Sequence, residues 1–267
     1  MSLTNIKNYI SKQLFVSQAG KNHQKIYLDI FDRRARKLLR TSGDFNVSSI
    51  EMWNFLLDCT LWNLVIDVGA NYGEMLVWAN LPKDVDVLAV EPNLHISYFL
   101  DKSLKKIGIN YSISNKAISD FCGKGIFKID KKWSGTSSLI KLEDQKIRVV
   151  DKRFMINTIE VATLSSLINQ DVSDKNVLIK IDVEGGEIGV LKGALDLLKI
   201  AKHYAVMMEI IHLRDEDLRW VFEFFKVYAY NYQTKTLVKI NTKSLAEFKE
   251  LMHSETLYQQ DVVLMKC

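Results

Sequence analysis

The sequence predicts a doubly wound α/β fold with a mostly parallel sheet. Short apolar segments alternate with helical segments, and the first apolar segment runs directly into a glycine turn. The predicted strands are the apolar runs Leu61–Val68, Val85–Val90, Tyr111–Ile113, Val177–Ile181 and Tyr204–Ile211. The predicted helices are Glu74–Asn80, Asn93–Ile107 and Glu187–Ala201. Strands that are apolar on both faces indicate a sheet buried between two layers of helices.

The N-terminal part is predicted to be a helical extension, residues 1–60, in front of a main domain of residues 61–267. Residues 2–40 contain few turn signals and are predicted to be mainly helical. A second helix is predicted over Val47–Asp58.

Two later regions interrupt the alternation. Residues 120–162 contain strand-like pieces at Gly125–Ile129, Ile147–Val150 and Phe154–Val161, which predict a β-rich insertion near the carboxyl edge of the sheet. After a helix around Glu216–Phe225, the order strand, turn, helix and final strand (Asp261–Met265) predicts an antiparallel end to the sheet.

The formal net charge of +4 comes from the first 60 residues, which hold nine Lys or Arg against five Asp or Glu. The excess is concentrated in one short cluster, Arg33, Arg34, Arg36, Lys37 and Arg40. A solvated helix face is the favoured interpretation, and contact with an anionic or membrane surface is the alternative. The rest of the chain has no basic stripe with interleaved aromatic residues, so no nucleic-acid partner is expected.

Cysteine usage and hydropathy predict a cytoplasmic protein. Cys59, Cys122 and Cys267 have no paired spacing and are expected to be free thiols. No signal peptide is expected, and Asp58 and Asp67 interrupt the longest apolar stretch, so no membrane span is expected either.

The glycine turn, Val65–Glu74, carries the strongest functional signal. Gly69 permits a tight turn, and Gly73 allows the following helix to pack closely. A nicotinamide site would require a glycine where Asn71 stands. Asp67 places a carboxylate before the turn, which suits a ligand carrying an ammonium and a sulfonium, and S-adenosylmethionine is such a ligand.

Three further segments end predicted strands with polar residues. Glu91 follows the next strand, at the distance where such folds hold a ribose diol. Lys180 and Asp182 are two residues apart and therefore share one face of their strand. Lys180 is predicted either to form a buried structural ion pair or to act in the site. Glu187 is expected to be an early-turn helix acid.

Glu209 and His212 end the following strand. A turn at Ile211 would release His212, which is otherwise expected to be structural or exposed. Its ordinary pKa range makes it the best candidate base in the chain.

At these residues the sequence resembles the FkbM-type S-adenosylmethionine-dependent methyltransferases. The resemblance covers residues 61–265 and rests on several blocks, Ile66–Gly73, Val90–Asn93, Asn115–Asp120, Thr163–Leu167, Ile179–Glu187 and Val190–Gly193. It implies a seven-stranded, Rossmann-like methyltransferase sheet and O-methylation of sugars or polyketides, often in bacterial surface glycans.

The resemblance also implies the positions of the cofactor. The methionine end would lie at Asp67, Gly69, Ala70, Asn71 and Gly73. The ribose would lie at Glu91, the adenine near Ala117 and Ile118, and the transferred methyl beside Asp182.

For the acceptor, the candidates are four residues of a polar loop and one acid, Trp133, Ser134, Ser137, Ser138 and Glu184. Hydroxyl and indole groups suit a sugar. The proton would be taken by Asp182 or His212, with Lys180 as a charge partner. Alternatively, Asp182 and Glu209 would help to bind a divalent ion, but the metal-free version is favoured.

Two other classes of function stay open: a nicotinamide-dependent oxidoreductase, and a non-catalytic binding module that keeps the fold.

Overall fold

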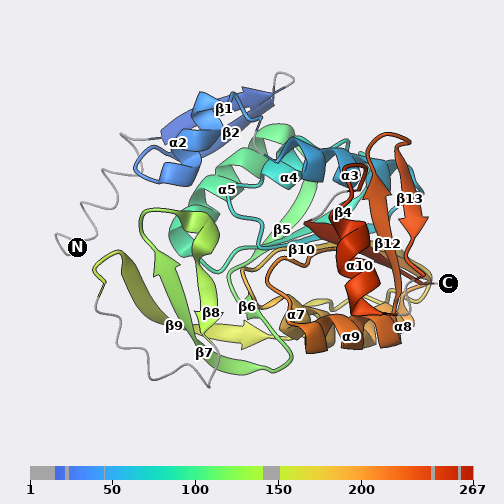
Figure 1. The fold of residues 1–267 in the computed structure, drawn as a ribbon. Coiled ribbons are helices and arrows are strands. Elements are labelled where there is room, and N and C mark those ends of the chain that lie inside the picture. Colours follow the sequence, from blue (N-terminus) through green and yellow to red (C-terminus); the bar gives the residue numbers. More distant parts are fainter. Residues whose placement is uncertain are drawn as a thin grey trace.

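The computed structural model describes residues 16–21, 24–44, 46–140, 151–241, 244–257 and 260–266. At the centre of the molecule is an eight-stranded sheet in the order β13-β12-β14-β11-β10-β3-β4-β5 (Figure 1). From one edge to the other its strands are Thr236–Lys239, Lys226–Asn231, Asp261–Met265, His203–Glu209, Asn176–Ile181, Leu64–Val68, Asp86–Val90 and Asn110–Ser114.

The five strands β11, β10, β3, β4 and β5 run parallel, which confirms the predicted parallel sheet. Alternate residues of β3 face opposite cores. Val65 packs with one cluster of buried residues, and Ile66 and Val68 pack with the other. Strands buried in this way read as continuous apolar runs in the sequence.

Helices cover both faces of the sheet, as a doubly wound fold requires. One face is covered by α3 (Val47–Asp58), α4 (Glu74–Val77) and α5 (Leu94–Ile107). The other face is covered by α6 (Leu164–Leu167), α7 (Glu187–Gly193), α8 (Leu195–Ile200), α9 (Asp215–Phe224) and α10 (Leu245–Met252). Among the described helices, none is long and apolar enough to cross a membrane.

The far end of the sheet is antiparallel, as predicted. The last strand, β14, lies between β11 and β12 and runs antiparallel to both. The described sheet has one strand more than the seven implied by the family resemblance, because β12 turns back into β13.

The prediction of a mainly helical N-terminal segment is wrong for the described part. Val16–Lys21 (β1) and Gln24–Asp29 (β2) form an antiparallel hairpin, and only Arg33–Arg40 (α2) is helical. In β2, Ile26 and Leu28 are fully buried, so the period-2 pattern of a half-buried strand was present in the sequence. The hairpin lies against α5, where the Tyr27 amide donates to Ser103 Oγ at 2.9 Å.

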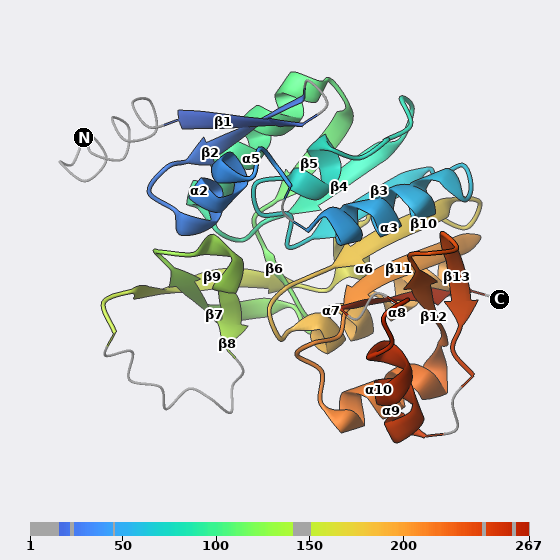
Figure 2. The ribbon, with the colours of Figure 1, turned by 45° about the horizontal axis from the view of Figure 1, so that its top comes forward.

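The predicted β-rich insertion is confirmed as a separate four-stranded sheet in the order β6-β9-β7-β8 (Figure 2). Its strands are Ala117–Ile118, Phe154–Ala162, Gly123–Asp130 and Ser138–Ile140 in that order. The predicted strand Ile147–Val150 lies outside the described residues.

Two predicted helices differ from the structure. The helix that follows the glycine turn ends at Val77, not at Asn80. The helix predicted over Glu187–Ala201 is divided at Ala194 into α7 and α8. At the end of α7, a Cβ on Gly193 would lie 2.1 Å from the carbonyl oxygen of Ser119, so the helix touches the segment after β6.

Candidate active site

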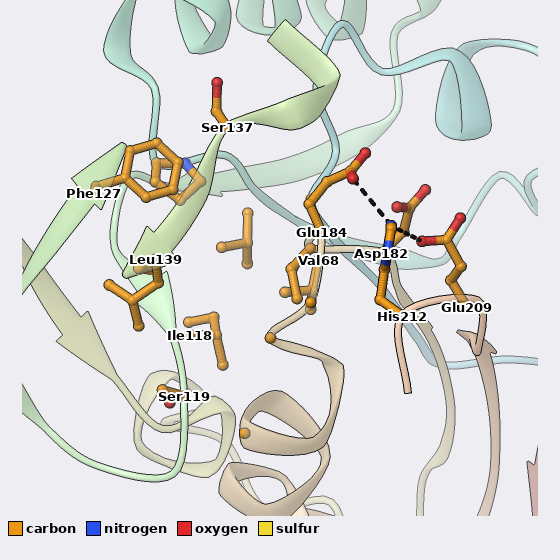
Figure 3. Close-up of a pocket in the computed structure, with 18 of the residues that line it drawn as sticks. Val68, Ile118, Ser119, Phe127, Ser137, Leu139, Asp182, Glu184, Glu209 and His212 are labelled. Carbon is orange, nitrogen blue, oxygen red and sulfur yellow. Dashed lines mark ion pairs between the residues drawn. The ribbon is translucent and has the colours of Figure 1, made fainter. Parts of the chain in front are cut away.

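A cavity of about 920 Å³ opens at the carboxyl ends of the parallel strands, between the main sheet and the insertion (Figure 3). Open α/β sheets bind ligands at this edge. The cavity is lined by residues that follow four neighbouring strands, Gly69 after β3, Glu91 after β4, Asp182 after β10, and Glu209 and His212 at the end of β11. The structure therefore brings together most of the residues that the sequence singles out.

The glycine turn is shaped by contact with the neighbouring strand. Gly69 has a φ of +88°, and a Cβ there would lie 1.9 Å from the carbonyl oxygen of Asp182. The amides of Gly69 and Ala70 both donate to Val90 O at 3.0 Å, so the turn is tied to β4 as well. Any side chain at position 69 would push these strand ends apart.

The second glycine of the turn packs against a helix. Gly73 also has a φ of +88°, and a Cβ there would lie 2.7 Å from Leu100 Cδ1 of α5. Gly73 and Asp67 face the interior, whereas Gly69 and Asn71 line the cavity.

Glu91 is buried, and main-chain amides hold both of its carboxylate oxygens. The Asn71 amide donates to Oε2 at 3.0 Å, and the Asn93 amide donates to Oε1 at 2.8 Å. Burial raises the pKa of Glu91 to about 7, although these two hydrogen bonds favour the ionised form. The carboxylate thus has a fixed orientation where it meets the cavity.

Asp67 and Lys180 form a buried charge cluster with Asp182. Lys180 Nζ lies 2.8 Å from Asp182 Oδ2, which confirms the predicted pair. Lys180 and Asp67 are register partners on adjacent strands. Asp67 is fully buried, and neither of its carboxylate oxygens has a hydrogen-bond partner among the described residues. Burial raises the pKa of Asp67 to about 6, against the influence of Lys180.

The side chain of Asp182 is about a third exposed, at 31%, whereas that of Lys180 is only 5% exposed. Although burial alone would raise it, the pKa of Asp182 is lowered, because Lys180 and Arg34 stabilise its charge. Asp182 is therefore an ionised and oriented carboxylate facing the cavity, and a weak base.

His212 meets two acids. Its Nε2 atom lies 3.3 Å from Glu184 Oε2 and 3.8 Å from Glu209 Oε2 (Figure 3). The strand ends at Glu209, which releases His212 to turn toward the cavity. Glu184 has a φ of 58° in the turn after β10. That left-handed conformation is uncommon outside glycine.

Glu209 has a strongly raised pKa. Burial, together with repulsion from the negative charges of Asp182, Asp261 and Glu184, raises it to about 8. Glu184 has a raised pKa for the same reasons, burial first and Asp182 second.

Glu187 has the structural role predicted for it. It is fully buried at the start of α7, and its Oε1 accepts from the Gly185 amide at 2.9 Å. It therefore stabilises the turn that presents Glu184.

The insertion closes the opposite wall. Trp133, Ser134 and Ser137 line the cavity, and Ser138 begins β8. Ser134 Oγ donates to Asn71 Oδ1 at 3.1 Å, which ties the insertion to the glycine turn. Apolar residues complete this wall, Ala117, Ile118, Ile126, Phe127, Leu139 and Ile140.

Arg34 also lines the cavity, although sequence reasoning placed it in a basic cluster on a solvated face or an anionic contact surface. The solvated-face interpretation is wrong for Arg34, whose side chain is 13% exposed and forms an ion pair with Glu74. The contact with an anionic group stays a prediction. Arg36 donates instead to the carbonyl oxygens of Ile30 and Phe31. The position of Arg34 within the sequence gave no signal, because its partner lies 40 residues away.

Across the described ranges, no group of three or more His, Cys, Asp or Glu residues is arranged to hold a metal ion. Cys59 and Cys122 are free and exposed.

Residues 67–236 match the methyltransferase FkbM domain family. Comparison with curated protein sequences gave no match. Similar solved structures include an S-adenosylmethionine-dependent O-methyltransferase from Thermotoga maritima, with 10% identity, 94% of this chain and 92% of that chain covered, and a TM-score of 0.41. An rRNA methylase from Streptococcus thermophilus has 12% identity, 82% and 92% coverage, and a TM-score of 0.39. Precorrin-6y C5,15-methyltransferase from Geobacter metallireducens has 11% identity, 83% and 89% coverage, and a TM-score of 0.40.

Proposed function

Because the chain belongs to the FkbM methyltransferase family, whose cofactor is S-adenosylmethionine, we propose that it methylates a hydroxyl group, in the first instance of a sugar. The observation that carries this proposal is the arrangement of His212 beside Glu184 and Glu209, at the same end of the cavity as the ionised Asp182. This group of side chains suits proton removal from a weakly acidic hydroxyl.

The residues present fit the cofactor. A volume of about 920 Å³ is near the upper end of the roughly 300–1,000 Å³ typical of small-molecule sites, which leaves room for cofactor and acceptor together. Glu91 offers a fixed carboxylate for a ribose diol, and the apolar pair Ala117 and Ile118 offers a surface for adenine. When bound, S-adenosylmethionine supplies an electrophilic methyl group on a sulfonium.

His212 is proposed as the base. With its Nε2 proton directed toward Glu184, Nδ1 would carry the lone pair that accepts the proton of the acceptor hydroxyl. The oxygen would take the methyl group that the cofactor supplies, and the bond from that methyl group to sulfur would break. Glu184 then faces the positive charge that develops on the imidazole. Asp182 is the weaker candidate, because Lys180 holds its pKa low. Its carboxylate is instead proposed to accept a hydrogen bond from a neighbouring hydroxyl of the acceptor, because the reacting hydroxyl gives its one proton to His212, and so to orient the reacting oxygen.

The wall opposite His212 supports a sugar acceptor. Trp133 and Phe127 offer apolar surfaces, and Ser137 offers a hydroxyl. A sugar presents an apolar ring face and several hydroxyls. The apolar residues of the insertion, Ile126, Leu139 and Ile140, also favour a second candidate, a hydroxyl on a polyketide. A glycan acceptor would place the protein in surface-polysaccharide synthesis in the cytoplasm.

The proposal can be tested by mass spectrometry. The protein is incubated with S-adenosylmethionine and a panel of nucleotide sugars, surface-glycan fragments and polyketides, and products are searched for the mass gain of one CH₂ group on oxygen. His212→Gln should lower the rate by about 10²–10⁴-fold. His203→Gln is the matched control, because His203 is exposed at the opposite end of β11. A methyl group found on nitrogen or carbon, or equal rates in both variants, would contradict the proposal.

A further inference from the structure

We infer that Arg34, which precedes the residues matching the family, binds the carboxylate of the methionine part of S-adenosylmethionine. This inference rests on the cofactor and on its orientation under the proposed function, and it goes beyond both by assigning the N-terminal segment a role in the site. It concerns cofactor binding alone and is independent of the identity of the acceptor.

Arg34 is held in place from several sides. Its own amide donates to Asp32 Oδ1 at 2.9 Å, where Asp32 is the N-cap of α2. Tyr72 Oη, in the glycine turn, donates to the other oxygen of Asp32 at 3.0 Å. On the insertion side, the Ser134 amide donates to Asp32 Oδ1 at 3.3 Å. Asp32 thus fixes the start of α2 to both walls of the cavity, and Arg34 extends between them.

The guanidinium reaches the glycine turn itself. It pairs with Glu74, and it lines a small polar pocket together with Gly69, Asn71 and Asp182. A Cβ on Gly135 would lie 3.0 Å from Arg34 Nε, so the insertion loop passes directly over the guanidinium. Burial opposes the charge, but Glu74 and Asp182 raise the pKa of Arg34, which keeps it cationic.

The order of the strands indicates where the methionine part would lie. The ribose is assigned to Glu91 after β4, and the methyl group to the residues after β10 and β11. The strand between β4 and β10 is β3. Since the sulfur atom is bonded to both the ribose carbon and the methyl group, it would lie near the end of β3. The remaining substituent on sulfur, the amino-acid chain, would then start beside Gly69 and Asn71.

The amino-acid chain ends in an ammonium and a carboxylate. The acids at this end of the cavity suit the ammonium, and the carboxylate needs a cation. Four cationic side chains line the cavity among the described residues, Arg34, Lys124, Lys192 and Arg214. Lys192 lies over the ring of Trp220, and Arg214 pairs with Asp217. Of these four, Arg34 alone also lines the pocket behind the end of β3, where the other cation, Lys180, is paired with Asp182.

The ion pair with Glu74 is compatible with this role. A guanidinium has five N–H donors in a planar fork, so one group can serve two anions. The competing interpretation is that Arg34 only neutralises the buried Glu74, whose side chain is 6% exposed. The two interpretations differ in whether Arg34 recognises the carboxylate of the cofactor.

Decarboxylated S-adenosylmethionine, which lacks only that carboxylate, separates them. Binding of both compounds to the full-length protein is measured by calorimetry without an acceptor. The wild-type protein should bind S-adenosylmethionine at least about tenfold more tightly. Arg34→Met should weaken the binding of S-adenosylmethionine by a similar factor and leave the affinity for the decarboxylated compound nearly unchanged. Arg33→Met, an exposed position on the same helix, should keep the wild-type ratio.

Two further variants allow for the loss of the ion pair. Arg34→Met combined with Glu74→Gln removes the carboxylate that would otherwise be stranded. Arg34→Lys keeps the charge, and its ratio should lie between those of wild type and Arg34→Met. The inference would be overturned if the wild-type protein bound both compounds with equal affinity. It would also be overturned if the Arg34 variants preferred S-adenosylmethionine over the decarboxylated compound as strongly as the wild-type protein does. Failure to bind S-adenosylmethionine at all would overturn the cofactor's place in this cavity as well, whereas failure to methylate hydroxyls would contradict only the proposed function.

Discussion

At the β4 side of the cavity, main-chain amides bind the carboxylate of Glu91. At the β10 and β11 side, the acidic side chains lie among other charged side chains. Glu91 accepts two amide hydrogen bonds, and its pKa is raised to about 7. Glu209 is surrounded by Asp182, Asp261 and Glu184, and its pKa is raised to about 8. One buried Glu209 oxygen has no hydrogen-bond partner among the described residues.

The comparison shows how similar burial can serve different purposes. Amide hydrogen bonds fix the position of Glu91 and limit the rise of its pKa, which suits the binding of a constant ligand. The raised pKa of Glu209, by contrast, depends partly on the charges of its neighbours Asp182, Asp261 and Glu184. We expect the first region to control cofactor affinity and the second to control turnover.

After His212→Gln, the largest effect is expected for Asp182→Asn. Loss of the ionised carboxylate should lower kcat by at least about 10²-fold, because the acceptor oxygen loses its orientation. The melting temperature should change little, because Lys180 keeps Asp67 as a charged neighbour. Turnover and thermal unfolding measured on one sample provide the check. A stability loss of about 3–5 kcal/mol would mean instead that the pair is structural.

Glu91→Gln is expected to act on cofactor affinity, by about tenfold near pH 8, because a charged hydrogen bond to the ribose is lost. A ribose diol donates to the ionised form, so wild-type affinity should fall as the pH drops below the pKa of Glu91, about 7. The decrease should level off at about the tenfold loss of the variant, because the protonated carboxyl, like the amide, makes no charged hydrogen bond. Calorimetric titration across this range should give a flat profile for the variant, and equal pH dependence in both proteins would refute the assignment.

Trp133→Ala is expected to raise the acceptor KM by several-fold and to leave cofactor affinity unchanged, because the ring lines the insertion wall. Trp133→Phe should restore most of the loss, since it keeps an aromatic surface. Steady-state kinetics with calorimetry tests both. Weaker cofactor binding in the alanine variant would place the ring in the other half of the cavity.

The smallest effect is expected for Glu209→Gln, on stability. The pKa of Glu209 is about 8 in the folded protein and near its ordinary value, 4.5, in the unfolded chain. Between these values the folded state holds a proton that the unfolded state releases, so this group's contribution to stability falls as the pH rises. As the pH rises, the melting temperature of the wild-type protein should therefore decrease by a few degrees more than that of the variant. A change of about 2–4 °C corresponds to 1 kcal/mol of stability. If the melting temperatures of the two proteins change with pH in parallel, the pKa of Glu209 is not raised in the folded protein.

Much of the fold could be predicted because the signals are local. The parallel strands follow from apolar runs, and the Lys180–Asp182 pair follows from the period of two in a strand. The glycine turn predicts its own positive φ at Gly69. At the N-terminus, the alternation of the buried residues Ile26 and Leu28 indicates a strand. The same segment has few turn residues, which favours a helix, and the sequence therefore does not predict the hairpin.

The sequence by itself thus determined the sheet, the insertion and the polar residues at the strand ends, because each depends on neighbours within a few positions. Only the tertiary structure decided that Arg34 enters the cavity, through an ion pair with a residue 40 positions away. Only the tertiary structure decided the pKa values of Glu91 and Glu209, because burial and charges from other elements set them. Burial and Coulomb interactions depend on distance in space, and a sequence pattern contains only distance along the chain.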